Sequence, residues 1–255
     1  MDVNKNSNTL GFTVIMVIIV AALLSTAAIE LKPFQDRNVE LEKKQNILNS
    51  VGVAIDRDGA EDLYPTYIKK ELVLNNKGEE VEGSAFDIDL GKEVKKEADA
   101  QLLPLFISEV DGKTRYIIPL RGKGLWGPIW GFISLEDDLN SVFGAVFDHK
   151  SETPGLGAEI NRASFQDPFS GKSIFEGEEF TSIKVIKGGA KQGDMHAVDG
   201  ISGGTITSDG VSDMLEERLR MYLPYFNTLK PAIEVDSVFN QLVSIASVNN
   251  SIIIN

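Results

Sequence analysis

An uninterrupted apolar segment lies close to the N-terminus of the chain. Residues 11–29, GFTVIMVIIVAALLSTAAI, carry no charged side chain, and about 20 such residues are what an α-helix needs to cross the hydrocarbon core of a bilayer. A cleaved signal peptide is the alternative, but only Lys5 supplies positive charge before the run, which exceeds a normal signal-peptide core. The sequence therefore predicts a short N-terminus at 1–10, a retained transmembrane helix at 11–30 and one domain at 31–255.

The charges that flank this segment do not decide its orientation. Lys32, Arg37, Lys43 and Lys44 follow the span and only Lys5 precedes it, which on a bare count would keep the large domain inside the cell. Long domains often cross regardless of such charges, and acidic residues are interleaved with the basic ones. The flanking sequence leaves the topology open.

Composition excludes several functional classes. With 25 basic and 38 acidic residues the formal net charge is −13, so the attraction to phosphate that drives nucleic-acid binding is missing on the scale of the whole chain. The absence of cysteine removes disulfides, cysteine-ligated clusters and thiol nucleophiles. The only histidines, His149 and His196, lie far apart and outside any metal-ligand spacing. We therefore expect neither a nucleic-acid partner nor a metal site.

Hydrophobic patterning predicts a single α+β domain behind the anchor. A helix is expected to continue beyond the span, because Val39, Ile47, Leu48 and Val51 fall at mostly helical intervals. Residues 64–120 are typical of hairpins with Asn/Asp–Gly turns and form a strand-rich insert. Two more strands are expected at 126–136 and 140–149, with Pro128 at a sheet edge or a strand start.

The remaining third of the chain is predicted to mix short elements with one amphipathic helix. A short helix within 158–171 should be stopped by Pro168, and 180–189 is typical of a strand. A helical stripe that Pro224 should curtail consists of Val211, Met214, Leu215, Leu219, Tyr222 and Leu223. The apolar tail 243–255 is expected to pack against the domain or a partner.

Two glycine motifs resemble nucleotide-binding loops but fail in context. GKGLWG at 122–127 satisfies Gly-x-Gly-x-x-Gly, yet it leads into a predicted strand and not into the helix that a dinucleotide fold requires. GKS at 171–173 matches the end of a phosphate-binding loop, but Gln166 stands where the first glycine is needed. Both nucleotide-binding folds are set aside.

The segment DGISGGTITSDGV, residues 199–211, joins a glycine turn to a predicted helix start. The unpaired N–H groups of a first helical turn attract anions, and Gly203 with Gly204 permits close approach of a phosphate. Ser202, Thr205 and Thr207 add hydroxyl donors. An ordinary Ser/Thr cap on a helix is the alternative, and the segment alone does not separate the two.

Two further loops have the composition of a site for a flat ring. The loop HKSETPGLGAEI at 149–160 presents Leu156 between glycines, with Glu152 and Thr153 as polar neighbours. Trp126 lies between glycines that leave its face accessible for stacking. Each of these features is equally consistent with a simple turn or a core residue.

Taken in order, GLWGPIWG, ETPGLG and SGGTITS behind an N-terminal span resemble the FMN-binding NqrC family of bacterial sodium-translocating NADH:quinone reductases. The resemblance implies that a separate magnesium-dependent flavin transferase joins the FMN phosphate to Thr205 through a phosphoester. Gly204 replaces the commoner alanine of the family motif. The cofactor-binding residues expected on this basis are Trp126, Glu152, Thr153, Leu156, Lys187, Ser202, Gly203, Gly204, Thr205 and Thr207.

The resemblance also implies the cellular role. Family members belong to a six-subunit complex with NqrA, NqrB, NqrD, NqrE and NqrF, which passes electrons from NADH to ubiquinone while exporting sodium. The NqrC protein relays electrons between an iron–sulfur centre of the other subunits and the flavin of NqrB, and it needs no catalytic acid–base residue and no metal of its own. Its domain lies on the outer side of the bacterial inner membrane. Lys187 is expected to favour an anionic reduced flavin by Coulomb attraction.

Two alternatives remain. The homologous flavoprotein subunit of the Rnf ferredoxin:NAD oxidoreductase shares the anchor and the threonine attachment, whereas GLWGPIWG and the strand-rich insert at 64–120 favour the quinone reductase. A noncatalytic, membrane-anchored scaffold in which all three glycine loops are turns is the second alternative.

Overall fold

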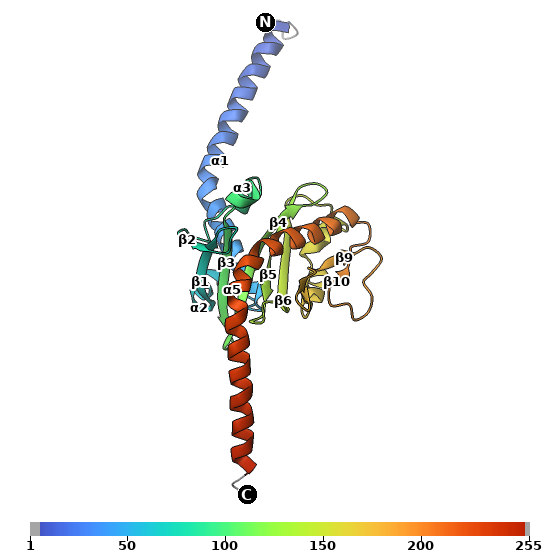
Figure 1. Cartoon of the computed structure of the whole chain (residues 1–255). Helices are drawn as coiled ribbons and strands as arrows, with labels where there is room; N and C mark the ends of the chain where they lie inside the picture. The colour runs from blue at the N-terminus through green and yellow to red at the C-terminus, as the bar shows by residue number, and fades with distance from the viewer. Residues whose placement is uncertain (1–5, 253–255) are drawn as a thin grey trace.

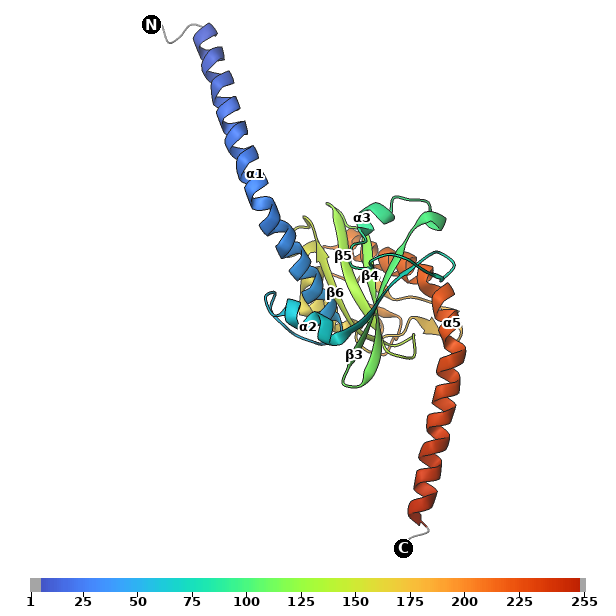
Figure 2. The same ribbon diagram turned by 90° about the vertical axis from the view of Figure 1, so that its left-hand side faces the viewer.

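An antiparallel sheet lies between two long helices that leave the domain in opposite directions (Figure 1, Figure 2). The computed structural model describes the backbone of residues 6–252 and the side chains of residues 8–230. The elements are α1 (Asn6–Ser50), α2 (Ala60–Tyr67), β1 (Ile68–Leu74), β2 (Glu80–Val81), α3 (Leu90–Glu93), η1 (Ala98–Ala100), β3 (Leu103–Val110), β4 (Lys113–Lys123), β5 (Pro128–Leu135), β6 (Val142–His149), η2 (Gly157–Asn161), α4 (Ala163–Gln166), η3 (Asp167–Phe169), β7 (Phe175–Glu176), β8 (Glu179–Phe180), β9 (Lys184–Ile186), β10 (Ala197–Asp199) and α5 (Thr205–Ile252).

Helix α1 is long and apolar enough to cross a membrane, and none of its most apolar stretch is buried in the domain. The expected continuation beyond the span is confirmed, because the helix runs without interruption to Ser50 and buries Ile47 and Leu48 against the sheet. Val39 lies on the same helix but is not part of the buried face. Its side chain is 67% exposed.

The sheet has the strand order β2-β1-β3-β4-β5-β6, and every neighbouring pair is antiparallel. Both predicted hairpins are present. Asp111 and Gly112 connect β3 to β4 with φ values of 54° and 73°, the left-handed pair that a tight hairpin turn requires. Pro128 begins β5, a strand between two others, so the strand-start alternative holds. The lack of a proline N–H is tolerated there, because Pro128 lies opposite Lys123 at the end of the hydrogen-bonded ladder between β4 and β5.

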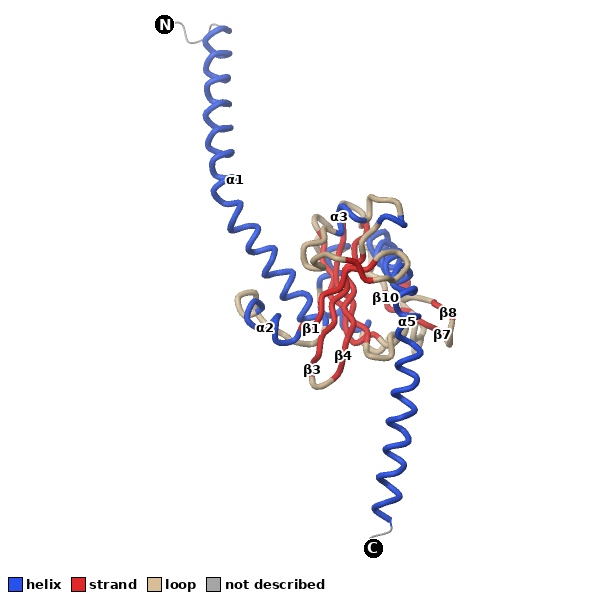
Figure 3. Tube along the Cα trace, turned by 60° about the vertical axis from the view of Figure 1, so that its left-hand side comes forward, coloured by secondary structure: helices blue, strands red, loops and turns tan. Residues whose placement is uncertain are grey.

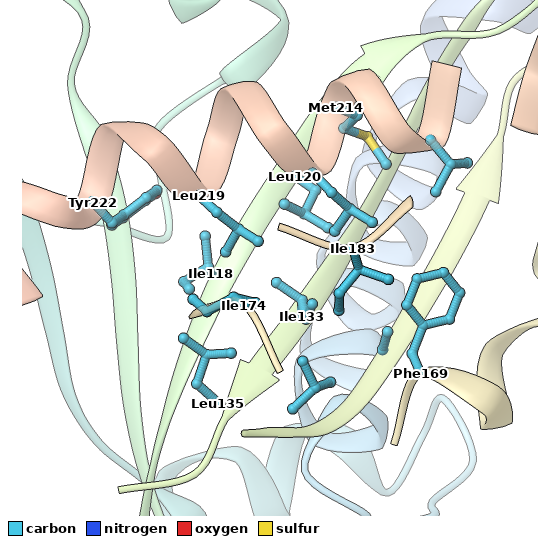
Figure 4. Close-up of a cluster of buried hydrophobic side chains, with 14 of the residues drawn as sticks. Ile118, Leu120, Ile133, Leu135, Phe169, Ile174, Ile183, Met214, Leu219 and Tyr222 are labelled. Carbon is cyan, nitrogen blue, oxygen red and sulfur yellow. The ribbon is translucent and has the colours of Figure 1, made fainter. Parts of the chain in front are cut away.

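Alternation along the strands supplies a core on each face of the sheet. On β4, Ile117 faces the side of α1 and α2, while Ile118 and Leu120 face α5 (Figure 4). The residues of α5 that cover this second face are Val211, Met214, Leu215, Leu219, Tyr222 and Phe226. Fully burying such a side chain stabilises the fold by about 1.5–3 kcal/mol. Figure 3 shows the resulting order of helix, sheet and helix.

The segment after β6 differs from the expected single helix and single strand. Residues 157–169 form η2, α4 and η3, because Arg162 adopts an extended conformation between the first two. The predicted stop is confirmed, because α4 ends at Gln166 with Asp167 as its C-cap, immediately before Pro168. Pro168 itself lies in the first turn of η3, whose first residues need no N–H. The strand predicted at 180–189 is reduced to β9, which pairs in parallel with β10 outside the main sheet.

Helix α5 carries the predicted apolar stripe, although it does not stop at Pro224. Leu219, Tyr222 and Phe226 are fully buried before and after the proline, and the Tyr222 hydroxyl donates to the Pro104 carbonyl at 2.7 Å. This packing offsets the backbone hydrogen bond that proline removes. The prediction that the tail 243–255 packs against the domain or a partner concerns residues that lie outside those whose side chains the structure describes.

Candidate functional site

The three glycine-containing loops meet at one end of the sheet. The loop at 124–127 joins β4 to β5, and Ile129 near the start of β5 pairs with His149 at the end of β6. The antiparallel register therefore brings the loop at 150–156 beside the first loop. The loop at 200–204 reaches the same region because it leads into α5, which packs across β4.

Glu152, in the second loop, hydrogen-bonds to the first loop and to helix α5. Its Oε1 accepts the backbone N–H of Trp126 at 2.8 Å, and its Oε2 accepts the hydroxyl of Thr207 at 2.6 Å. The side chain is 5% exposed. Burial alone would raise the pKa of the carboxyl, but the hydrogen bonds from Thr207 and from backbone N–H groups of residues 125–127 outweigh it and lower the pKa below the ordinary value.

Two glycines make room for this carboxylate. A Cβ on Gly124 would lie 2.6 Å from Oε1 of Glu152, and one on Gly157 would lie 2.5 Å from Oε2 and 2.4 Å from the Thr207 hydroxyl. Any larger residue at either position would displace the carboxylate. Gly124 of GKGLWG and Gly157 of ETPGLG therefore have a packing function.

The first turn of α5 is open to an anion. The helix begins at Thr205, and Gly204 occupies the cap position, so no Ser or Thr side chain caps it. Among the described residues, the N–H groups of 205–207 have no hydrogen-bond partner, whereas the N–H of Ser208 makes the first helical bond, to Gly204. The simple Ser/Thr cap proposed as an alternative is not what the structure shows.

A cavity of about 400 Å³ lies in front of this helix start. Its lining includes Ser202, Gly203, Thr205, Lys187 and Asp199. Lys187 follows the last residue of β9, and Asp199 is the last residue of the parallel strand β10. Both residues therefore lie at the same end of this two-stranded sheet. Gly203 has a φ of +76°, a backbone conformation that favours glycine.

Two apolar side chains stand exposed on the neighbouring loops. Trp126 is 66% exposed although its backbone is anchored, and Leu156 is 40% exposed. Leu156 Cδ2 lies 2.6 Å from the position that a Cβ on Gly203 would take, so the second loop touches the third. The side chain of Thr153 is exposed, and its carbonyl accepts the N–H groups of Leu156 and Ala158.

The structure separates the predicted hydroxyl cluster into two groups. Ser202 and Thr205 line the cavity, whereas Thr207 is 1% exposed and its hydroxyl is already bonded to Glu152. The interpretation from sequence missed Ser208, whose hydroxyl accepts the N–H of Ile201 at 3.1 Å and holds the loop on the helix. Its position in TITS was visible, but nothing in the sequence showed which hydroxyls face inward.

Comparison with known proteins identifies the family. The NqrC protein of the Na(+)-translocating NADH-quinone reductase from Vibrio alginolyticus is 33% identical over 221 residues, which cover 80% of this chain and 86% of that protein. The chain belongs to this NqrC family. The corresponding protein of Vibrio vulnificus (strain YJ016) is similarly related, with 34% identity over 220 residues, 80% of this chain and 86% of that protein.

Solved structures of the NqrC family have the same fold. The crystal structure from Parabacteroides distasonis is 45% identical and superposes with a TM-score of 0.71, covering 76% of this chain and 96% of that one. NqrC of Shewanella oneidensis is 27% identical with a TM-score of 0.66, covering 75% and 98%. A model of the FMN-binding domain family matches residues 124–220, the range that contains all three loops. The predicted family and α+β fold are thereby confirmed.

Proposed function

We propose that this chain is the FMN-carrying electron-transfer subunit of a sodium-pumping NADH:ubiquinone oxidoreductase, with the FMN phosphate joined to the Thr205 hydroxyl by a phosphoester. The observation that carries the proposal is the position of Thr205. It is the first residue of α5, it lines the cavity, and it lies among N–H groups that have no partner within the described part of the chain.

The residues around Thr205 fit a phosphorylated flavin. The free N–H groups of the first helical turn and the positive end of the helix dipole favour a phosphate. Gly203 and Gly204 present no side chain on that approach, and Ser202 supplies a further donor. Trp126 and Leu156 offer exposed apolar surface on the adjoining loops for a flat ring.

FMN, when bound, supplies the electron-transfer chemistry, and the protein binds, orients and tunes it. Lys187 lines the same cavity as Thr205, and in this proposal its positive charge attracts negative charge on the ring. In this proposal the protein relays electrons from an iron–sulfur centre of other membrane subunits to the flavin of NqrB. NqrA, NqrB, NqrD, NqrE and NqrF complete the complex, which reduces ubiquinone with NADH and exports sodium.

Membrane attachment follows from α1. The helix meets the length and apolarity of a membrane span, and the family relationship supports a membrane-anchored protein. We place residues 1–10 inside the cell and the domain 31–255 on the outer side of the bacterial inner membrane. A covalent link made by a separate flavin transferase suits that location, because a noncovalent site empties by mass action where free FMN is scarce.

In-gel flavin fluorescence after SDS denaturation tests the attachment. The full chain, coproduced with a flavin transferase, should give a fluorescent band, and the Thr205→Ala variant should be dark. Thr228→Ala is the matched control, because this exposed threonine also lies on α5, away from the cavity. A fluorescent Thr205→Ala band, or a dark wild-type band, would contradict the proposal.

The electron donor and acceptor require a second measurement. The two Vibrio relatives are named as parts of an NADH-quinone reductase, which favours NADH and quinone over the ferredoxin-linked Rnf alternative. Membranes that contain the complete complex should reduce ubiquinone with NADH in a sodium-dependent manner. Activity with reduced ferredoxin and NAD in place of NADH and quinone would support the Rnf alternative.

A further inference from the structure

The structure assigns Glu152 and Thr207 a positioning role: together they form a buried latch that holds the loop at 124–127 against the first turn of α5 and thereby presents Thr205 for flavin attachment. This inference rests on the proposed function and changes the role that the sequence predicts for both residues. The sequence predicts direct cofactor contacts. In the structure the two side chains bond to each other, and Glu152 also accepts the N–H of Trp126, so their inferred action on the cofactor passes through Trp126 and Thr205.

The contacts of the carboxylate support this assignment. Oε1 of Glu152 is occupied by the N–H of Trp126, and Oε2 by the hydroxyl of Thr207. Glu152 is 5% exposed and Thr207 is 1% exposed, and neither lines the cavity that contains Thr205. Both side chains already form hydrogen bonds inside the protein. A ligand in that cavity therefore contacts other residues.

Helix geometry explains how the latch acts on Thr205. Successive residues of an α-helix are separated by about 100°, so residues two apart face nearly opposite sides. Thr205 faces the cavity, and Thr207 faces the protein interior. A bond that fixes the rotation of Thr207 about the helix axis therefore fixes Thr205 as well, because the first turn is one rigid unit.

Two glycines that pack against the latch restrict the orientation of the Glu152 carboxylate. Gly124 packs against Oε1 of Glu152, and Gly157 packs against both Oε2 and the hydroxyl of Thr207. The carboxylate therefore has little freedom to turn away from its partners. Its negative charge also lies at the third residue of α5, where the helix dipole stabilises an anion.

The latch has a consequence for which threonine hydroxyl accepts the FMN phosphate. Thr207 is the second threonine of TITS and the other threonine near the helix start that could be considered as the acceptor of the phosphate. Its buried hydroxyl would have to leave Glu152 to become accessible, and an unpaired carboxylate oxygen would remain in the interior. Thr205 is therefore the acceptor, and Thr207 sets its orientation.

The test compares Thr207→Val with Thr207→Ser in the full chain coproduced with a flavin transferase. Valine keeps the shape of threonine and removes the hydroxyl, whereas serine keeps the hydroxyl. We expect Thr207→Val to slow flavin attachment about tenfold or more, as expected when a buried acceptor loses its donor. Thr207→Ser should restore the rate to within about twofold.

A second measurement follows the loop at 124–127, which the latch holds against α5. In a Trp130→Phe background, the emission of Trp126 and its quenching by acrylamide report the loop at 124–127, because the chain holds only these two tryptophans. Thr207→Val should change both quantities in the flavin-free protein, and Glu152→Gln should change them in the same direction. The double variant should be no worse than the more severe single one, because either change opens the same latch.

Leu219→Ala controls for a general loss of stability. Leu219 is fully buried on α5 but does not line the cavity, so this variant should destabilise the domain while its folded fraction still accepts flavin. The latch is overturned if Thr207→Val attaches flavin at the wild-type rate with unchanged Trp126 emission, or if Leu219→Ala loses as much attachment. A dark wild-type protein would instead overturn the proposed function.

Discussion

The side chain of Leu156 lies against Gly203, with Cδ2 only 2.6 Å from where a Cβ of residue 203 would stand. This contact joins the loop after β6 to the loop before α5, although 47 positions separate the two residues in the sequence (203 − 156). It places an exposed apolar side chain beside the helix start that holds Thr205. A side chain added at residue 203 would therefore disturb both loops at once.

Gly203→Ala should impair flavin attachment more than it impairs folding. An alanine at a φ of +76° is strained by about 1–2 kcal/mol, and its Cβ would push Leu156 away from the cavity. Gly171→Ala is the matched control, since its φ is +77° and a Cβ there would meet nothing within 4 Å. Thermal unfolding should show similar losses in both variants, and in-gel fluorescence should fall only in Gly203→Ala. Equal fluorescence would show that the Leu156 contact is irrelevant to the flavin.

Lys187→Met should lower the flavin midpoint potential. Removing a positive charge near the ring disfavours the anionic reduced form, and a unit charge at about 4 Å in water contributes about 1 kcal/mol, which is about 40 mV for one electron. Lys191→Met removes an exposed lysine that does not line the cavity and serves as the control. Spectroelectrochemical titration of both variants measures the effect. An unchanged potential in Lys187→Met would remove the proposed role.

Glu152→Gln should alter how stability depends on pH. The pKa of Glu152 is lowered in the folded state from the ordinary value of 4.5, so the stabilisation is complete above that value and is lost as the pH falls through the folded pKa. We expect the variant to be about 1–3 kcal/mol less stable than wild type at pH 7, with a smaller difference near pH 3. Denaturant unfolding at both pH values measures this. Glu109→Gln, which changes an exposed glutamate on β3, should leave the pH profile unchanged, and a constant difference for Glu152→Gln would contradict the prediction.

Gly78→Ala should destabilise the domain by about 2–4 kcal/mol, of which about 1–2 kcal/mol is backbone strain and the rest overpacking. Gly78 has a φ of +78°, and a Cβ there would lie 2.4 Å from the backbone nitrogen of Tyr225 on α5. Gly112→Ala isolates the strain, because its φ is +73° with nothing within 4 Å of the added atom. Tryptophan-monitored unfolding compares the two variants. Equal losses would mean that the turn at Gly78 does not support α5 beyond Pro224.

Local sequence was sufficient to predict the elements that depend only on residues close together in the chain. The Asp-Gly turn at 111–112 and the alternation around it predicted the hairpin of β3 and β4, because left-handed turn residues and a period of two act within a few residues. Pro224 misled the prediction for the same reason. A proline signals lost backbone hydrogen bonding locally, but the buried Tyr222 and Phe226 keep α5 helical through residue 224.

The sequence by itself determined that the chain has an apolar anchor, that an α+β domain follows, and that Thr205 opens a helix behind a glycine turn, since each depends on neighbouring residues. Only the tertiary structure decided which hydroxyls of the site face the cavity and which face the interior. Glu152 and Thr207 are 55 residues apart in the chain, and neither has a local signal for its partner. Their bond exists because the register of β5 with β6 and the packing of α5 on β4 bring the loops to one end of the sheet.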